Sequence, residues 1–340
     1  MNGTKILLCM PTHSGIIHAF EAGLKHHGFE VTVFPFEDRD FKYPSLWARL
    51  SIKCQQALFG KKDAKEQLKR RLLAQKLQQL LTHAQFDHIL FIRGDLFPTD
   101  TLSTLRNTLN RPFTNYQWDG LDRYPDIWNY LPYFDKFYVF DPKDLKYPQH
   151  AFLPTTNFYF DHLPGQENHS AQFDCYFTGT HQSEREHSLK HFSEYADQHG
   201  LKLDFHVAGL SADLARYQDY PSIQTSKTGF NYLDNLQKIR NAKAIVDFKT
   251  AAHNGLSFRA FEALGYRKKL ITTNADIQKY DFYHPDNIFI WDGQHLDGLD
   301  AFLAKPLHAF PPELYEKYSF GNWIRYILDI QPHQKITLPE

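Results

Sequence analysis

Hydrophobic positions at the start of the chain follow a strand–helix–strand order. Residues 5–10 are a nearly continuous apolar run, which is typical of a parallel strand covered on both faces. Apolar residues then recur at helical spacing over residues 18–27, and Gly28 is suited to end that helix. Residues 30–36 alternate between apolar and polar positions, as a second strand does. This order predicts an α/β unit built on a parallel sheet.

The alternation of strands and helices continues in two series along the chain. Residues 45–82 are helical in pattern, and an irregular, proline-containing stretch over residues 148–170 separates the two series. We therefore expect two Rossmann-like domains, residues 1–155 and residues 156–320. Further strands are predicted over residues 88–92, 112–118, 137–140, 173–177, 203–207, 244–248, 269–273 and 287–291, and further helices over residues 99–109, 183–199, 230–242, 257–264 and 320–328.

Composition excludes two broad classes of protein. The 340 residues include 38 Lys and Arg against 39 Asp and Glu, so the formal net charge is −1. A general nucleic-acid binder would show a basic surplus, and we expect no nucleic-acid partner. Aromatic residues make up 16% of the chain, whereas disordered chains contain few of them.

Cysteine usage and the apolar runs bear on the cellular compartment. Cys9, Cys54 and Cys175 lie far apart without a CxxC pair, which argues against a disulfide scaffold and a zinc ribbon. The first apolar run is shorter than a signal peptide requires, and no run reaches the ~18 apolar residues of a transmembrane helix. We expect a cytoplasmic protein that would meet a membrane only at its surface.

Several well-defined catalytic motifs are absent from the sequence. There is no GxxxxGK[ST] loop, no GxGxxG after a strand, no GxSxG and no HExxH. Asp38-Arg39-Asp40 could imitate an acidic metal-binding pair, but a solvated loop after the second strand is the better interpretation. No metal is expected.

The segment 247–265 is the most specific in the chain. A predicted strand ends near its start, a loop with Gly255 follows, and Ser257 is placed to cap the next helix. Amide groups at a helix start can bind an anion, and Arg259 and Lys249 would add positive charge toward a diphosphate. One turn further along, Glu262 could accept hydrogen bonds from sugar or ribose hydroxyls.

This segment resembles the donor-binding region of GT-B glycosyltransferases, especially CgeB-like and lipopolysaccharide or capsule enzymes. These carry a G-[LIV]-x-x-R-x-[FL]-E-A-[LM]-[AG] pattern followed by a strand and Thr or Thr-Asn. Weaker similarity lies in residues 177–185, 152–154 and 318–323. The matching residues are Gly255, Leu256, Arg259, Phe261, Glu262, Ala263, Leu264 and Gly265.

The resemblance implies the GT-B fold, in which two Rossmann-like domains face each other across a cleft. Residues 1–155 would form the acceptor side and residues 156–320 the nucleotide-sugar donor side. A terminal helix within residues 321–340 would cross back onto the first domain. The implied donor-binding residues are Gly179, Thr180, His181, Lys249, Asn254, Gly255, Leu256, Ser257, Arg259 and Glu262.

Two observations weigh against a direct transfer of the family's chemistry. An Arg-x-Phe-Glu-Ala-Leu string is also an ordinary helix sequence, with Phe261 and Leu264 on one buried face. Many retaining members have a second Glu eight residues before the helix Glu, where this chain has Asn254. The anomeric outcome is therefore not carried over. The position of the string after an apolar strand in the second series favours a functional role.

Three residues are candidates for the general base that an inverting transfer requires. His13, Asp95 and Asp119 each follow a predicted strand of the first domain and would face the cleft. Asp119-Gly120 is also ordinary turn chemistry, and His13 could simply satisfy backbone groups. We rank Asp119 first because Asp122 and Arg123 lie close to it in the sequence.

A basic run over residues 61–76 has two interpretations. It is either a solvated helix face or a docking surface for anionic lipid, in which Trp47, Leu50 and Leu58 would add shallow apolar contacts. A lipid-linked acceptor would suit the second interpretation, with residues 45–82 on the membrane surface.

The sequence and its resemblance together predict a glycosyltransferase without a cofactor, which uses a nucleotide sugar as co-substrate. The implied acceptor is a glycan or glycolipid of a bacterial surface polymer, reached at the inner face of the cytoplasmic membrane. Two alternatives stay open: a sugar-nucleotide epimerase of the same fold, and a non-catalytic carbohydrate-binding or assembly protein. Donor turnover and its products separate the three.

Overall fold

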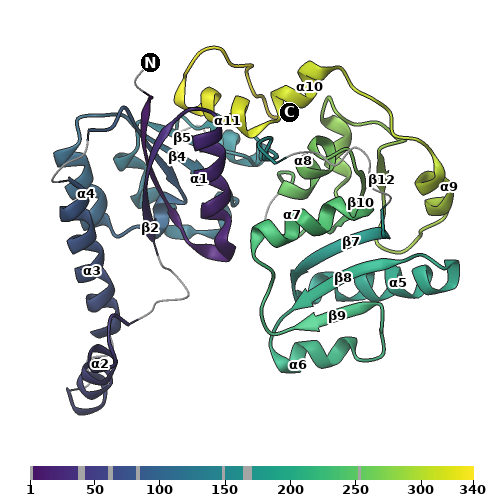
Figure 1. The fold of residues 1–340 in the computed structure, drawn as a ribbon, viewed down its shortest axis with the longest axis horizontal. Helices are drawn as coiled ribbons and strands as arrows, with labels where there is room; N and C mark the ends of the chain where they lie inside the picture. The colour runs from purple at the N-terminus through teal and green to yellow at the C-terminus, as the bar shows by residue number, and fades with distance from the viewer. Residues whose placement is uncertain are drawn as a thin grey trace.

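The computed structural model contains two parallel β-sheets, one in each half of the chain (Figure 1). Helices connect most successive strands, so the chain is an α/β protein throughout. The two halves lie side by side, with α1 and α7 in contact between them. The structure describes residues 3–36, 43–59, 64–81, 85–147, 150–163, 171–251 and 254–340.

The first sheet has the strand order β2-β1-β3-β4-β5-β6, and each neighbouring pair is parallel. Residues 6–10 of β1 are fully buried because the strand is covered on both faces. The order reverses between β1 and β3, which favours a ligand site at the carboxyl ends of these strands. The elements are β1 (Lys5–Pro11), α1 (Ile16–His26), β2 (Glu30–Phe36), α2 (Leu46–Phe59), α3 (Ala64–Leu81), β3 (His88–Ile92), α4 (Thr99–Thr108), β4 (Phe113–Gln117), β5 (Lys136–Val139) and β6 (Leu153–Pro154).

The second sheet has the order β12-β11-β10-β7-β8-β9 and is also parallel. Its order reverses between β7 and β10, which places a second switch point at their carboxyl ends. The elements are β7 (Phe173–Thr180), α5 (Ser183–His199), β8 (Leu203–Ala208), α6 (Ser211–Leu214), β9 (Ile223–Ser226), α7 (Tyr232–Arg240), β10 (Ala242–Asp247), α8 (Phe258–Gly265), β11 (Lys269–Thr272), β12 (Ile288–Ile290), α9 (Leu299–Ala304), α10 (Pro312–Lys317) and α11 (Phe320–Leu328).

These elements confirm the predicted α/β class with two Rossmann-like halves. The region predicted as helical over residues 45–82 consists of two helices, α2 and α3. The sequence pattern does not predict β6 or β9, nor the short helices α6, α9 and α10. β9 reads Ile-Gln-Thr-Ser and buries only its first residue, so it has neither an apolar run nor a clear alternation.

The segment that joins the two sheets is buried. Residues 155–158 are at most 2% exposed, and the ring of Phe158 lies among helices from both halves. Its centroid is 5.6 Å from that of Phe20 in α1, 5.3 Å from Phe258 in α8 and 4.4 Å from Trp323 in α11. One aromatic cluster therefore packs the N-terminal half, the C-terminal half and the last helix together.

Helix α11 lies on the N-terminal half. It contacts α1, and the Tyr326 hydroxyl donates a hydrogen bond to the Pro154 carbonyl oxygen at 3.0 Å. The helix ends at Leu328, because Asp329 adopts a left-handed backbone with φ of 59°. The helix predicted over residues 320–328 is therefore confirmed, and the remainder of the segment 321–340 is not helical.

Replacing Trp323 by Ala should destabilise the whole protein. Trp323 is fully buried in the cluster around Phe158, so the truncation leaves a cavity and should cost about 3–5 kcal/mol of unfolding free energy. Urea denaturation followed by circular dichroism measures this change. The matched control is Trp47→Ala, because Trp47 is 81% exposed and its loss should change stability by about 0.5 kcal/mol or less. Equal losses in the two variants would contradict the proposed role of the cluster.

Candidate active site

The residues predicted to carry chemistry lie at the carboxyl ends of strands. His13 belongs to the turn after β1, Asp95 to the turn after β3, and Asp119 to the loop after β4. Since these strands are neighbours in one parallel sheet, their ends lie on one edge. The predicted donor-binding residues end β7 or follow β7 and β10: Gly179, Thr180, His181, Lys249, Asn254, Gly255, Leu256, Ser257, Arg259 and Glu262.

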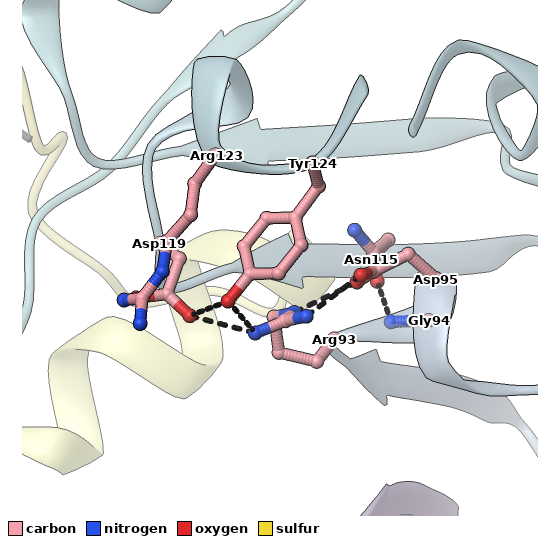
Figure 2. A network of polar contacts seen from close by, with 7 residues as sticks. All are labelled: Arg93, Gly94, Asp95, Asn115, Asp119, Arg123 and Tyr124. Carbon is pink, nitrogen blue, oxygen red and sulfur yellow. Dashed lines mark hydrogen bonds and ion pairs between the residues drawn. The ribbon is translucent and has the colours of Figure 1, made fainter. Parts of the chain in front are cut away.

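A buried arginine organises this edge of the first sheet (Figure 2). Arg93 ends β3 in a left-handed backbone conformation with φ of 58°, which is uncommon for a residue other than glycine. Its Nε and Nη2 atoms donate to the two carboxylate oxygens of Asp95, each at 2.8 Å. Its Nη1 atom donates to Asp119 Oδ2 at 2.6 Å and to the Tyr124 hydroxyl at 2.8 Å. Arg123 adds a further contact to Asp119 at 3.3 Å.

This Arg93 network changes the expected roles of the two carboxylates. Burial alone would lower the pKa of Arg93, but the hydrogen bond and charge of Asp95 and the charge of Asp119 outweigh it and raise that pKa. Arg93 therefore stays charged and engages both carboxylates. Asp95 and Asp119, predicted as candidate bases, are each ion-paired rather than free. For His13, the structure describes the backbone of the turn but not the side chain.

At the corresponding edge of the second sheet, Asp247 at the end of β10 accepts hydrogen bonds from several donors. Ser257 precedes α8 as its cap residue, but the Ser257 hydroxyl donates to Asp247 Oδ1 at 2.8 Å and does not cap the helix amides. The Thr272 hydroxyl donates to Asp247 Oδ2 at 3.2 Å, and Arg259 Nη1 approaches Asp247 Oδ1 at 3.4 Å. The prediction that the Ser257 side chain caps α8 is therefore wrong, because its hydroxyl contacts Asp247 instead. The predicted start of the helix is confirmed.

Two arginines meet beside the end of β7. Arg259 donates to the Thr178 carbonyl oxygen at 2.5 Å, and Arg185 donates to the Thr180 carbonyl oxygen. Both guanidinium groups lie over the ring of Phe177, at 5.3 Å for Arg185 and 5.5 Å for Arg259. Arg185 is 6% exposed, and burial together with the charge of Arg259 lowers its pKa to about 10. Arg185 is not among the predicted donor-binding residues, although its position in the first turn of the helix after β7 is a signal that could have identified it.

The end of β7 contacts the arginine pair, and the loop after it contacts other residues of the C-terminal half. A side chain at Gly179 would place its Cβ 2.7 Å from Arg185 Nη2, so glycine leaves room for the guanidinium. Thr180 supplies the carbonyl oxygen that Arg185 contacts. His181 Nδ1 lies 2.9 Å from the Tyr217 hydroxyl, and its Nε2 lies 3.8 Å from Asp213.

Glu262 does not lie where its predicted role requires. The residue is 1% exposed, and its Oε1 atom accepts a hydrogen bond from the Tyr232 hydroxyl at 2.6 Å. Burial raises the pKa of the Glu262 carboxyl above its ordinary value. The prediction that this carboxylate meets ligand hydroxyls is therefore corrected: in this structure it joins α8 to α7 inside the protein.

Lys249 and the residues before α8 are also engaged. The Lys249 ammonium contacts Asp276 Oδ2 at 3.0 Å, and this hydrogen bond lowers the pKa of Asp276. The Asn254 amide and the Leu256 carbonyl oxygen form hydrogen bonds with the side chains of Asp141, which follows β5, and Asn157, in the segment that joins the two sheets. Gly255 packs against Phe140. Each predicted cation shares its carboxylate: Lys249 shares Asp276 with Lys279, and Arg259 shares Asp247 with two hydroxyl groups.

The structure offers no assembled metal site in the part of the chain that it describes. Within those residues, no group of three or more His, Cys, Asp or Glu side chains could hold a metal ion. Asp38, Arg39 and Asp40 lie outside the described residues.

Known structures share the arrangement of the two halves. AviGT4, a glycosyltransferase involved in avilamycin A biosynthesis, aligns over 89% of both chains with a TM-score of 0.52 and 11% identity. A Listeria monocytogenes structure assigned as a UDP-N-acetylglucosamine 2-epimerase aligns over 99% of this chain and 100% of its own, with a TM-score of 0.54 and 11% identity. The chain has the GT-B fold. No protein-family profile matches the sequence, and no curated protein matches it.

The Arg93 network and the arginine pair lie at the carboxyl ends of the two sheets, the edge at which open α/β sheets bind ligands. A third polar group flanks this edge after β5. Asp144 is buried and accepts a hydrogen bond from the Leu121 amide at 3.1 Å. Burial, and to a smaller extent the charges of Asp141 and Asp122, raise the pKa of Asp144 to about 7.

Asp144 should make the protein less stable as the pH rises. Its pKa is higher in the folded chain than its ordinary value of 3.8, so the folded state binds more protons between about pH 4 and pH 7. The free energy of unfolding therefore falls with rising pH across this window. Asp144→Asn removes that fall and should stabilise the protein more at about pH 8 than at about pH 5, as urea denaturation would measure. Asp126→Asn, at an exposed site, is the control, and an equal gain in both variants would argue against this assignment.

Proposed function

We propose that this protein binds a nucleotide sugar and transfers the sugar to an acceptor hydroxyl. The arginine pair carries the proposal. Arg185 donates to a neutral carbonyl oxygen, and its Nε atom has no partner among the described residues. Arg259 shares one carboxylate, Asp247, with two hydroxyl groups.

The charge balance at this edge favours an anionic ligand. Arg185 is buried and Arg259 is half-buried, and the two guanidinium groups lie close enough for Arg259 to lower the pKa of Arg185, with a single carboxylate contacting Arg259. Buried charges are costly unless they are paired. A diphosphate would supply the missing negative charge, and guanidinium groups can bind its oxygens in bidentate fashion. A nucleotide sugar carries such a diphosphate as its leaving group.

The arrangement supports a transfer in which the chain stabilises the departing diphosphate. As the bond between the sugar carbon and the diphosphate oxygen breaks, negative charge grows on that oxygen, and Arg185 and Arg259 would stabilise it. These cations lead us to propose that neither metal nor cofactor is needed. The acceptor hydroxyl would approach from the edge with the Arg93 network, where His13, Asp95 or Asp119 would take its proton. For the two carboxylates this requires release from Arg93.

A second function shares this ligand. The Listeria monocytogenes structure is assigned as an epimerase of UDP-N-acetylglucosamine, and its alignment spans nearly all of both chains. UDP-N-acetylglucosamine is therefore the first donor to test. A transferase releases UDP and glycosylates an acceptor, whereas an epimerase changes the sugar without an acceptor. A non-catalytic carbohydrate-binding protein would bind the donor and leave it unchanged.

Removing either arginine should weaken donor binding. Arg259→Gln and Arg185→Gln each delete one charge-assisted contact, so the Kd for the nucleotide sugar should rise about tenfold to a hundredfold. Isothermal titration calorimetry with UDP-N-acetylglucosamine and a panel of nucleotide sugars measures it. Lys243→Gln is the control, because this exposed cation lies on β10 near the end away from Asp247. Unchanged donor affinity in both arginine variants would overturn the site assignment.

We further propose that the acceptor is a lipid-linked glycan of a bacterial surface polymer, reached at an anionic membrane at the cytoplasmic face. The helices α2 and α3 extend away from the sheet, with α2 at the far end (Figure 1). Leu46, Trp47 and Leu50 on α2 are 76%, 81% and 53% exposed, and Arg70 and Arg71 on α3 are also exposed. Exposed apolar and basic side chains on one extension fit an anionic bilayer surface. Within the described residues, no helix is long and apolar enough to span a membrane.

The extension formed by α2 and α3 should bind anionic liposomes. Each basic residue near such a surface contributes ~1 kcal/mol, and salt screens this attraction. Co-sedimentation should therefore increase with phosphatidylglycerol content, decrease with salt, and decrease when Lys65, Lys69, Arg70 and Arg71 are replaced by Glu. Lys61 and Lys62, also predicted to contribute, lie outside the described residues, as does the side chain of Leu58. If the wild-type protein stays in the supernatant at low salt, these helices form an ordinary solvated surface.

A further inference from the structure

The loop before α8 is held by the N-terminal half of the protein. The Asn254 amide donates a hydrogen bond to Asp141 Oδ2 at 2.7 Å, and Asp141 follows β5 of the first sheet. Asp141 is 2% exposed, and its Oδ1 atom accepts from the Lys143 amide at 2.9 Å. A single buried carboxylate thus caps the turn after β5 and binds the loop of the opposite half.

A second residue holds the same loop two positions later. Asn157, in the buried linker, donates from Nδ2 to the Leu256 carbonyl oxygen at 2.9 Å. Its Oδ1 atom accepts from the Tyr116 hydroxyl of β4 at 2.5 Å, which fixes the orientation of the amide. Between the two hydrogen bonds, a Cβ at Gly255 would lie 2.6 Å from the ring and the carbonyl oxygen of Phe140.

We propose that Asp141 and Asn157 are positioning residues that set the loop 254–257 for the nucleotide sugar. The Ser257 hydroxyl ties the end of this loop to Asp247, which also contacts Arg259. Displacement of the loop would therefore move α8 and Arg259 relative to Arg185. The donor site is then formed jointly by the two halves, and its affinity depends on their docking.

The effect of Asp141 and Asn157 on the loop can be measured separately from their effect on ligand binding. The role toward the ligand rests on the proposed function, whereas the hold on the loop depends on the protein alone. Hydrogen exchange of the loop measures the hold, and donor binding and turnover measure the consequence.

The test uses two nearly isosteric variants and a matched control. Asp141→Asn removes one acceptor, and Asn157→Asp keeps the acceptor for Tyr116 but places an oxygen opposite the Leu256 carbonyl. Asp144→Asn is the control, because Asp144 is equally buried in the same turn but contacts the Leu121 amide. Hydrogen exchange read by mass spectrometry follows the peptide that contains residues 254–258, and urea denaturation checks overall stability.

Exchange of this peptide should become about tenfold faster or more in Asp141→Asn and Asn157→Asp, whereas in Asp144→Asn it should change only as far as the overall stability measured by urea denaturation changes. The donor KM should rise by a similar factor while kcat changes less, because the loss is in binding. Unchanged exchange in both test variants, or the same increase in the control, overturns the proposal. Faster exchange with an unchanged donor KM also overturns the positioning role. If the wild-type protein binds no nucleotide sugar while loop exchange responds as expected, the proposed function fails and the hold on the loop stands.

Discussion

The packing of Phe158 between three helices is the contact on which the arrangement of the two sheets depends. Its ring lies against Phe20 of α1, Phe258 of α8 and Trp323 of α11, so it joins the two halves and the last helix. Because such interiors are close-packed, a shift of one helix displaces the others. The neighbouring Asn157 adds a directional hydrogen bond to the start of α8. Apolar burial thus brings the two halves together, and the polar contact fixes their relative position.

The two edges differ in how their arginines are neutralised. Arg93 is bound by two carboxylates and a phenol hydroxyl, so its charge is fully used within the protein. Of the other two arginines, Arg259 contacts one carboxylate, and Arg185 and Arg259 each donate to a neutral carbonyl oxygen. The contacts of Arg93 fix the geometry of its loop, so we regard this network as structural. The contacts of Arg185 and Arg259 leave positive charge for a ligand, so we regard this pair as the candidate binding site.

The sequence predicts the sheets well because buried parallel strands are apolar throughout, as β1 and β3 show. It does not predict β9, where a single buried residue leaves no pattern. It predicts the strand, loop and helix of the segment 247–265 but not the direction of Glu262, which depends on how α8 packs against α7. Arg93, the buried partner of Asp119, lies 26 positions away from it, and Asp141, the partner of Asn254, lies 113 positions away, and no local pattern encodes such contacts.

Gly255 and Arg185 show which residues support a functional argument. The loop glycine matches a donor-binding pattern, yet the Phe140 ring and carbonyl oxygen already exclude a side chain there, whether or not a ligand binds. Its identity is therefore explained by packing. Packing does not explain Arg185, since burying it beside Arg259 disfavours its charge and lowers its pKa to about 10. Burial of such a charge is costly without a compensating partner, and we propose that an anionic ligand is that partner at this edge.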